Sequence, residues 1–257
     1  MNRLLRAAVL MVLVFGRGPV QASPLQEIKD AESRDTENTE TSKKDFQHSL
    51  SGLYGVENLL SSVEQPYQDF DVLYSKAHQA QFELESLCNY TALLSHTQPH
   101  FSGIKSKQRA KTKIETELNG QVNKITDLAR ATIVANNVSD LMMAYENLNR
   151  ESTIVKVKNR FKNPGASGYR DLNLLVKLPK TGLIAEVQLH LADIAEVKSG
   201  PEHAIYEKIQ NVERLAVLEQ REFSPFELAQ IDNLRKQSQA MYQQAWQTYL
   251  TPNSSAA

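Results

Sequence analysis

Hydrophobic positions follow two rhythms along the chain, one typical of helices and one typical of strands. Between Pro66 and about Leu94 they recur every three or four residues, with Gln and Glu on the opposite side, which predicts an amphipathic helix. From about residue 125 onward, runs rich in Ile, Val, Leu and Thr predict four strands, at 125–134, 153–160, 170–178 and 183–190. A helical pattern at 139–150 separates the first two of these strands.

The predicted strands are followed by two further helices. Pro179-Lys-Thr-Gly182 joins the last two strands as a hairpin loop of four residues. Helices are then predicted at 201–221 and 225–249, the second beginning with Ser224, Pro225 and Glu227 as N-cap, first helical residue and capping box. The pattern as a whole predicts an α+β domain. Its sheet is expected to be mixed and largely antiparallel, flanked by helices that include a long N-terminal one and C-terminal ones.

The first 22 residues have the pattern of a secretory signal peptide. Arg3 and Arg6 precede an apolar run of nine residues at 7–15, and Val20-Gln-Ala22 supplies the small residues that a signal peptidase accepts. An uncleaved anchor is the alternative, but the run is shorter than the 20 or so residues that a membrane span needs. We therefore expect cleavage after Ala22 and export to the periplasm or the medium.

Composition sets the expectation for the remaining chain. Residues 23–50 are polar and are predicted to form a flexible leader, 51–250 the folded domain and 251–257 a frayed tail. The whole chain has a net charge of −1, so any attraction for phosphate must be local. The single cysteine, Cys88, excludes an intramolecular disulfide and a cysteine-rich zinc site. No later segment is apolar enough to span a bilayer, so no membrane contact is expected after cleavage.

Basic residues cluster in two places. In the first cluster, Lys105, Arg109 and Lys113 would share one face of a helix and converge on one anion. In the second, a spacing of two places four basic side chains on one side of a strand: Lys156, Lys158, Arg160 and Lys162. Each run alone is more often a solvated surface, but two of them in one domain favour a polyphosphate site.

Two acids stand on predicted strands. Glu186, Gln188 and His190 alternate with apolar residues and form the polar face of one strand, which on an edge strand would simply be wet. Asp127 is expected on the first strand, on the same face as the small residues Ala129 and Ala131. Asp127 and Glu186 together are suited to hold Mg²⁺ against a nucleotide polyphosphate.

A glycine and an aromatic residue mark the entry to the third strand. Gly168 permits a close backbone approach, and the ring of Tyr169 offers a flat surface on which a base can stack. A core aromatic that caps the sheet is an equally good interpretation of Tyr169.

In order, these pieces resemble the RelA/SpoT-type nucleotidyltransferase domain, the synthetase of the alarmone (p)ppGpp. The resemblance covers about residues 101–215. It is carried by five short motifs: Ile104-Lys-Ser-Lys-Gln-Arg-Ala-Lys-Thr-Lys113, Ile125-Thr-Asp-Leu-Ala129 with Ile133-Val134, Gly168-Tyr-Arg170, Ala185-Glu-Val-Gln-Leu189 and His203-Ala-Ile-Tyr206. No His-Asp dipeptide occurs in the chain, so the resemblance is to a small form that has the synthetase without the hydrolase.

The resemblance implies transfer of pyrophosphate from ATP to the 3′-hydroxyl of a purine nucleotide, as in guanosine tetraphosphate metabolism. Asp127 would bind Mg²⁺, Glu186 would assist the metal or take the hydroxyl proton, and Tyr169 would stack on the acceptor base. The remaining implied nucleotide contacts are Lys105, Arg109 and Lys113 on the donor side, Arg160 and Lys162 on acceptor phosphates, and Arg170, Gln188 and His203.

Departures from the family pattern leave other functions open. Gly103 and Thr132 stand where arginines are usual, and Asp171 and Asn173 stand where Ser and His are common. One alternative is an exported effector or toxin that modifies nucleotides or RNA. Another is a nucleotide-binding module that no longer catalyses. The sequence does not determine the acceptor or the oligomeric state.

Overall fold

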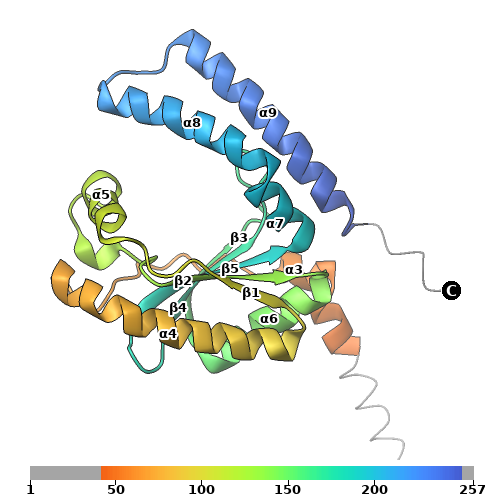
Figure 1. Ribbon diagram of the computed structural model, residues 1–257. Coiled ribbons are helices and arrows are strands. Elements are labelled where there is room, and N and C mark those ends of the chain that lie inside the picture. Colours follow the sequence, from red (N-terminus) through yellow and green to blue (C-terminus); the bar gives the residue numbers. More distant parts are fainter. Residues whose placement is uncertain (1–41, 251–257) are drawn as a thin grey trace, which may run out of the picture. The chain divides into compact units, whose positions relative to one another are not determined.

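The computed structural model describes residues 42–250 (Figure 1). The predicted signal peptide, residues 23–41 of the predicted leader and the tail at 251–257 lie outside the described residues. The chain divides after Asp45, and the sheet with the helices around it belongs to the second unit, which begins at Phe46. Leu50 already packs against the core of this unit, and Ser49 accepts a hydrogen bond from Gly52 as a helix N-cap.

Most helices of this unit precede or follow a run of strands, with β3, β4 and β5 consecutive in the chain. The helices are α3 (Leu50–Gly55), α4 (Phe70–Ser95), α5 (Lys107–Glu117), α6 (Val138–Glu151), α7 (Ala192–Ser199), α8 (Pro201–Leu218) and α9 (Pro225–Gln247). The strands are β1 (Gln98–Phe101), β2 (Arg130–Ala135), β3 (Thr153–Asn159), β4 (Leu172–Lys177) and β5 (Ile184–Leu191). Within residues 42–250, no helix has the length and apolar composition to cross a membrane.

The five strands form one sheet in the order β1-β2-β5-β4-β3. Strands β2 and β5 are parallel, and every other neighbouring pair is antiparallel. This confirms the predicted α+β class with a mixed, largely antiparallel sheet. The hairpin between β4 and β5 is also confirmed, since Leu178 donates to Leu183 and Gly182 donates to Leu178 across the loop.

Several details differ from the sequence prediction, and helix α3 is one element that it did not include. Strand β2 begins at Arg130, five residues later than predicted, because the backbone of the preceding segment bonds to loops: Leu128 accepts from Lys105 N, and Ile125 accepts from the Gln65 amide. Strand β1 and helix α7 were not predicted. Both are short, four and eight residues, and β1 contains a proline, so neither shows a clear period.

The two faces of the sheet have different chemistry. Helices α4 and α6 cover one face, and α7 lies over the other with α8 and α9 beyond it (Figure 1). Strand β5 shows the division: Ala185, Val187 and Leu189 are buried in the core, while Glu186 and Gln188 on the opposite face are half-buried. The polar face lies on the α7 side, where it is available to a ligand.

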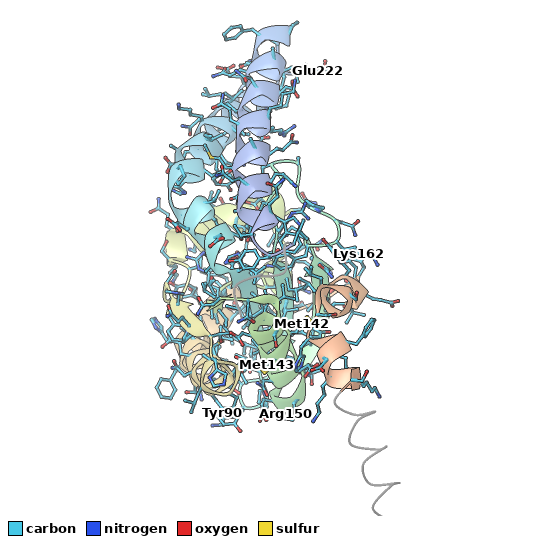
Figure 2. All side chains as sticks on the ribbon, turned by 90° about the vertical axis from the view of Figure 1, so that its right-hand side faces the viewer. Tyr90, Met142, Met143, Arg150, Lys162 and Glu222 are labelled. Atoms are coloured by element: carbon cyan, nitrogen blue, oxygen red, sulfur yellow. The ribbon has the colours of Figure 1, made fainter. Side chains whose placement is uncertain are left out.

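Helices α8 and α9 form an antiparallel hairpin that extends away from the sheet (Figure 1). Its outer part has a small core of four residues, Ile205, Ile209, Ile231 and Leu234. Glu222 lies in the turn at its far end (Figure 2). The capping box at Ser224 and Glu227 is confirmed, and the other end of α9 buries Tyr242 and Trp246 in the main core.

Candidate active site

A cavity of about 650 Å³ opens on the polar face of the sheet. Its floor includes Arg130 of β2 with Glu186 and Gln188 of β5, and its roof includes Lys198 of α7 and His203 of α8. A volume of this size is ordinary for the binding site of a nucleotide-sized ligand. Five of the predicted site residues line it, namely Arg109, Tyr169, Glu186, Gln188 and His203, whereas Asp127, Lys105 and Lys113 are not among its lining residues.

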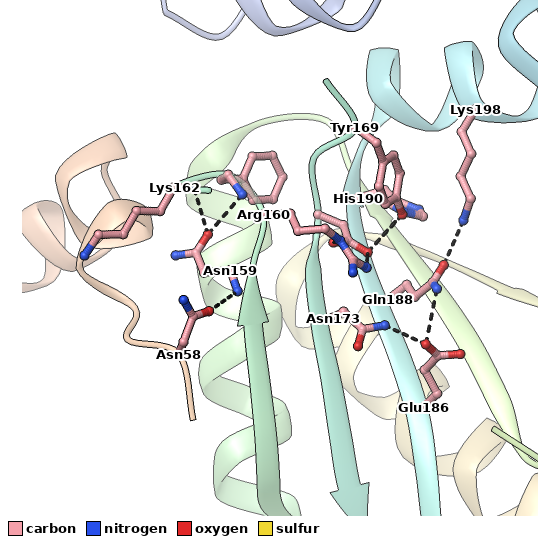
Figure 3. A network of polar contacts seen from close by, with 12 residues as sticks. Asn58, Asn159, Arg160, Lys162, Tyr169, Asn173, Glu186, Gln188, His190 and Lys198 are labelled. Atoms are coloured by element: carbon pink, nitrogen blue, oxygen red, sulfur yellow. Dashed lines mark hydrogen bonds and ion pairs between the residues drawn. The ribbon is translucent and has the colours of Figure 1, made fainter. Parts of the chain in front are cut away.

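The strand register explains how the floor is assembled. Parallel pairing of β2 with β5 places Arg130 opposite Glu186, and antiparallel pairing of β4 with β5 places Asn173 opposite Gln188. Asn173 Nδ2 donates to Glu186 Oε1 over 2.6 Å, and Gln188 Nε2 reaches the same oxygen at 3.4 Å (Figure 3). Glu186 Oε2 accepts no hydrogen bond from the described residues. The shared polar face of Glu186, Gln188 and His190 is confirmed.

Asp127 lies in the loop before β2 and not on the strand, so the predicted face shared with Ala129 and Ala131 is wrong. Its Oδ2 atom receives ion pairs from Lys105 Nζ at 3.0 Å and Lys113 Nζ at 2.9 Å. Its Oδ1 atom is buried and has no hydrogen-bond partner among residues 42–250. Burial by itself would raise the pKa of Asp127, but the hydrogen bonds and charges of Lys113 and Lys105 outweigh it and lower the pKa. The carboxylate is therefore ionised and keeps one oxygen for a further cation.

The first basic cluster is only partly arranged as predicted. Helix α5 begins at Lys107 with Ser106 as its N-cap, so Lys105 precedes the helix and does not share its face. Lys105 and Lys113 nevertheless converge on one anion, which is the Asp127 carboxylate itself. Arg109 stays exposed on α5 and lines the cavity.

The second basic cluster breaks at the end of its strand. Strand β3 stops at Asn159, whose side-chain oxygen accepts from the backbone N–H groups of Phe161 and Lys162, both at 3.1 Å. This turn directs the exposed Lys162 away from Glu186 and Gln188 (Figure 3). The prediction that all four basic side chains point the same way is therefore wrong at Lys162.

Arg160 is committed to a buried partner. Its Nε and Nη2 atoms donate to the two carboxylate oxygens of Asp171, at 2.6 and 2.7 Å. The side chain of Asp171 has no exposed surface, and burial raises its pKa, although the hydrogen bonds from Arg160 oppose that rise. Arg160 is not among the described residues that line the cavity.

Tyr169 joins this buried pair and also lines the cavity. Its hydroxyl donates to Asp171 Oδ2 over 2.9 Å and contacts His190 Nε2. The hydroxyl has a single proton, so Nε2–H of His190 is the donor to the hydroxyl oxygen. Burial holds the pKa of His190 well below its ordinary value, with a further lowering from Lys198 and Arg160, and the ring is therefore neutral. We name these four residues, Arg160, Tyr169, Asp171 and His190, the Asp171 network.

Two predicted contacts diverge. Arg170 turns away from the cavity: its Nη1 donates to the carbonyl of Phe161, and its guanidinium lies 5.1 Å from the centre of the Trp246 ring. Successive side chains of an extended chain point to opposite sides, so Arg170 points away from the side that its neighbour Tyr169 takes. His203 does line the cavity and is paired with Glu207 on the same helix at 3.3 Å.

Lys198 and Glu202 are among the cavity residues that were not predicted. Lys198 comes from the missed helix α7, and its Nζ donates to Gln188 Oε1 over 2.8 Å. Glu202 is buried, and its two oxygens accept from the hydroxyls of Ser238 and Tyr242, which ties α8 to α9 beside the cavity. A basic residue seven positions after the end of β5 was the available signal for Lys198.

Comparison with known proteins agrees with this geometry. No family model matches the chain. Among curated proteins, the (p)ppApp synthetase toxin Tas1 of Pseudomonas aeruginosa (strain UCBPP-PA14) is 30% identical over 135 residues, which are 52% of this chain and 30% of that protein. The chain thus corresponds to less than a third of the length of this relative.

Two solved structures share the fold. The Type VI effector Tas1, in complex with its immunity protein, matches with a TM-score of 0.53 and 24% identity, over 69% of this chain and 96% of that one. The small alarmone synthetase 2 from Bacillus subtilis matches with a TM-score of 0.50 and 22% identity, over 68% and 94%.

The chain shares its fold with these two structures. With the sequence match to Tas1 over 135 residues, the resemblance to the RelA/SpoT-type synthetase domain found in the motifs is confirmed.

Proposed function

We propose that this chain transfers pyrophosphate from ATP to the 3′-hydroxyl of a purine nucleotide. The observation that carries the proposal is the Asp127 carboxylate, which is ionised between two lysines and keeps a buried oxygen without a partner among the described residues. An unsatisfied buried acceptor on an ionised carboxylate is suited to a cation that arrives with a ligand. The name of the relative, a (p)ppApp synthetase, supports the same reaction class.

The donor side follows from the basic residues around the cavity. Lys105 and Lys113 place two positive charges beside Asp127, while Arg109 and Arg130 line the cavity directly. Arg130 Nε is buried and has no hydrogen-bond partner among the described residues, so it is available to a phosphate oxygen. We infer that these residues hold the triphosphate of ATP. Phosphoryl-type transfer is mainly positioning and neutralisation of charge, which such a set supplies.

Asp127 and Glu186 fit Mg²⁺, which would neutralise the transferred phosphates. The backbone N–H of Glu186 donates to the carbonyl of Ala129, two residues after Asp127, which ties the two acids to the same strand junction. Each has a carboxylate oxygen that accepts no hydrogen bond from residues 42–250, Oδ1 of Asp127 and Oε2 of Glu186. The described residues contain no cluster of three or more acids, histidines or cysteines, so the remaining ligands would be phosphate oxygens and water.

In the alternative to metal binding, Glu186 takes the proton of the acceptor hydroxyl with the same Oε2 atom. In the transfer, the bond from the acceptor O3′ to the β-phosphorus forms, the bond from that phosphorus to the bridging oxygen of the α-phosphate breaks, and AMP leaves. Asn173 and Gln188 fix the Glu186 side chain through Oε1 and leave Oε2 for this step. Tyr169 is the one aromatic residue of the Gly168-Tyr-Arg170 motif and lines the cavity beside these groups, which supports its role at the acceptor base.

The test is an assay with labelled ATP. The chain without residues 1–22 is incubated with Mg²⁺ and, in turn, AMP, ADP, GDP and GTP, and products are resolved by mass. We expect a nucleotide heavier by one pyrophosphate together with AMP. Asp127→Asn should lose this product, and Asp232→Asn, an exposed acid on α9 paired with Lys236, should retain it. Binding of nucleotides without any product would instead favour the non-catalytic binding module.

Export and action as a toxin form a second proposal. The charged and apolar pattern of residues 1–22 supports export, and the similar protein Tas1 is named a toxin and a Type VI effector. Expression of residues 23–257 inside a bacterial cytoplasm should then arrest growth and deplete ATP, while the Asp127→Asn variant should be harmless. Normal growth with unchanged nucleotide pools would contradict the proposal.

A further inference from the structure

The side chain of Lys198 lies between the roof and the floor of the cavity. It comes from α7, and its Nζ atom donates to Gln188 Oε1 over 2.8 Å (Figure 3). The same Nζ atom lies 5.5 Å from the centre of the Tyr169 ring, at the distance of a cation–π contact. Lys198 therefore contacts both the residue proposed to meet the acceptor base and the amide that supports Glu186.

The ring of Tyr169 is surrounded on several sides. The Arg160 guanidinium lies 5.2 Å from its centre, and the rings of His190 and Tyr242 meet it edge-on, with centroids 5.7 and 5.6 Å away. Figure 3 shows the ring between the side chains of Arg160 and Lys198. A purine can stack on Tyr169 only if one of these two cations moves.

The two cations are held very differently. Arg160 makes two charge-assisted hydrogen bonds to the fully buried Asp171, at 2.6 and 2.7 Å. Lys198 has one hydrogen bond, to a neutral amide, and no carboxylate of the described residues lies within 4.0 Å of its Nζ atom. A lysine side chain is also flexible, while the guanidinium of Arg160 is fixed as a fork on its carboxylate. Lys198 is the cation that can leave.

The environment of Lys198 favours an anionic partner. Burial lowers its pKa, the charges of Asp171 and Glu186 oppose this, and the charges of Arg160 and Arg130 add to it. A partly buried ammonium group without an ion pair is costly, and a phosphate group in the cavity would compensate it.

We propose that Lys198 is an acceptor-binding residue, which leaves the Tyr169 ring when the base stacks there and pairs with a phosphate group of the acceptor nucleotide. This inference rests on the proposed function and adds a specificity: acceptors are selected by the number of their phosphates. It also links acceptor binding to Gln188, whose amide loses the Lys198 hydrogen bond at the same time.

The test compares the full chain with Lys198→Gln by calorimetry, with the donor site filled by α,β-methylene ATP, which cannot transfer pyrophosphate. Guanosine and adenosine are titrated alongside their mono-, di- and triphosphates. We expect the affinity of the wild type to rise with phosphate number. Lys198→Gln should weaken binding of the di- and triphosphates about 10- to 100-fold, the range of a charge-assisted hydrogen bond, and change binding of the nucleosides less than about 3-fold.

Two further variants separate charge from structure. Lys198→Arg keeps the cation and should restore most of the phosphate dependence. Lys208→Gln, at an exposed position of α8 that does not line the cavity, should behave as the wild type. Thermal denaturation of each variant is measured first. If Lys198→Gln does not fold, the comparison of Lys198→Arg with the wild type and with Lys208→Gln takes its place.

The outcomes are distinct. An equal loss of affinity for nucleosides and nucleotides, or an unchanged phosphate dependence in Lys198→Gln, overturns the inference while the proposed function stands. If no purine nucleoside or nucleotide binds to the wild type beside the donor analogue, both the proposed function and the inference are wrong.

Discussion

Asp127 and Asp171 are two buried carboxylates, and both are bonded to basic side chains. Asp171 uses both of its oxygens: Arg160 donates to each of them, and the Tyr169 hydroxyl adds a third hydrogen bond. Asp127 uses only Oδ2, on which Lys105 and Lys113 converge, and its Oδ1 has no partner among the described residues. We call Asp171 with its partners the closed site and Asp127 with its two lysines the open site.

The difference separates a structural ion pair from a ligand site. A buried carboxylate with all its acceptor positions used has nothing left for a ligand, and its cost of burial is met within the protein. A carboxylate with a free buried oxygen is incomplete until a cation arrives. The pKa directions also differ: burial outweighs the hydrogen bonds of Arg160 and raises the pKa of Asp171, whereas the two lysines overcome burial and lower that of Asp127.

The largest expected effect is on catalysis at the open site. Asp127→Asn removes the negative charge between the two lysines and should lower kcat for pyrophosphate transfer about 1,000-fold, as the loss of a preorganised electrostatic group does. The rate is measured with labelled ATP and the best acceptor of the panel. Asp232→Asn is the matched control. A variant with Asn at position 127 that keeps more than a tenth of the rate would show that the open oxygen is not used.

The closed site should instead control stability. Asp171→Asn leaves the Arg160 guanidinium without its charged partner, and we expect a loss of about 3 kcal/mol in the free energy of unfolding. Urea denaturation measures it. The control is Asp71→Asn, which breaks the exposed pair with Lys107 and should cost less than about 1 kcal/mol. Equal losses for the two variants would mean that the Asp171 network is not closed in solution.

The sequence revealed the open site more readily than the closed one. Asp127, Lys105 and Lys113 stand in short motifs, and the alternation around Glu186 and Gln188 assigned their shared face directly. The Asp171 network depends on register instead: Arg160 meets Asp171 only because β3 and β4 pair antiparallel, with Lys158 opposite Asn173. Such a partnership between residues from two strands is not visible in either strand alone.

Helix and strand boundaries were predictable where side chains showed a period, and less so elsewhere. The buried residues Ile125 and Leu128 have the composition of a strand start, yet their carbonyls bond to Gln65 and Lys105 from distant loops. Lys162 was misplaced because an Asn159 side chain ended the strand in a turn. Lys198 was missed with its whole helix. Hydrogen bonds from distant loops thus set the start of β2, and a local hydrogen bond from the Asn159 side chain set the position of Lys162.

Two glycines allow a smaller comparison between the regions. Gly168 adjoins Tyr169 of the closed network with a φ of 82°, and a Cβ there would lie 3.1 Å from Gln239 Cα. Gly103 lies two residues before Lys105 with a φ of 67° and has open space around the same position. Gly168→Ala should lower the free energy of unfolding by about 2 kcal/mol and Gly103→Ala by about 1 kcal/mol. Denaturation of both variants measures the difference, and a larger loss at position 103 would contradict it.

The smallest effect is a difference in pH dependence between the two regions. His190 is neutral in the folded state because its pKa is lowered by burial, while in the unfolded state it titrates near its ordinary value of about 6.5. The unfolded chain therefore binds more protons below pH 6.5. As the pH is lowered through this range, the free energy of unfolding should decrease by up to about 1.4 kcal/mol per pH unit because of His190.

Asp127 affects the free energy of unfolding in a different pH range. Its pKa is lowered in the folded state, so its contribution to stability is present above its ordinary pKa near 4 and is lost only as the pH falls below that value. Urea denaturation between pH 7.5 and 5.5 thus isolates the closed region. His190→Gln keeps a donor for the Tyr169 hydroxyl and should flatten the slope, whereas His203→Gln, at an exposed position, should leave it as in the wild type. An unaltered slope in His190→Gln would mean that His190 is protonated in the fold.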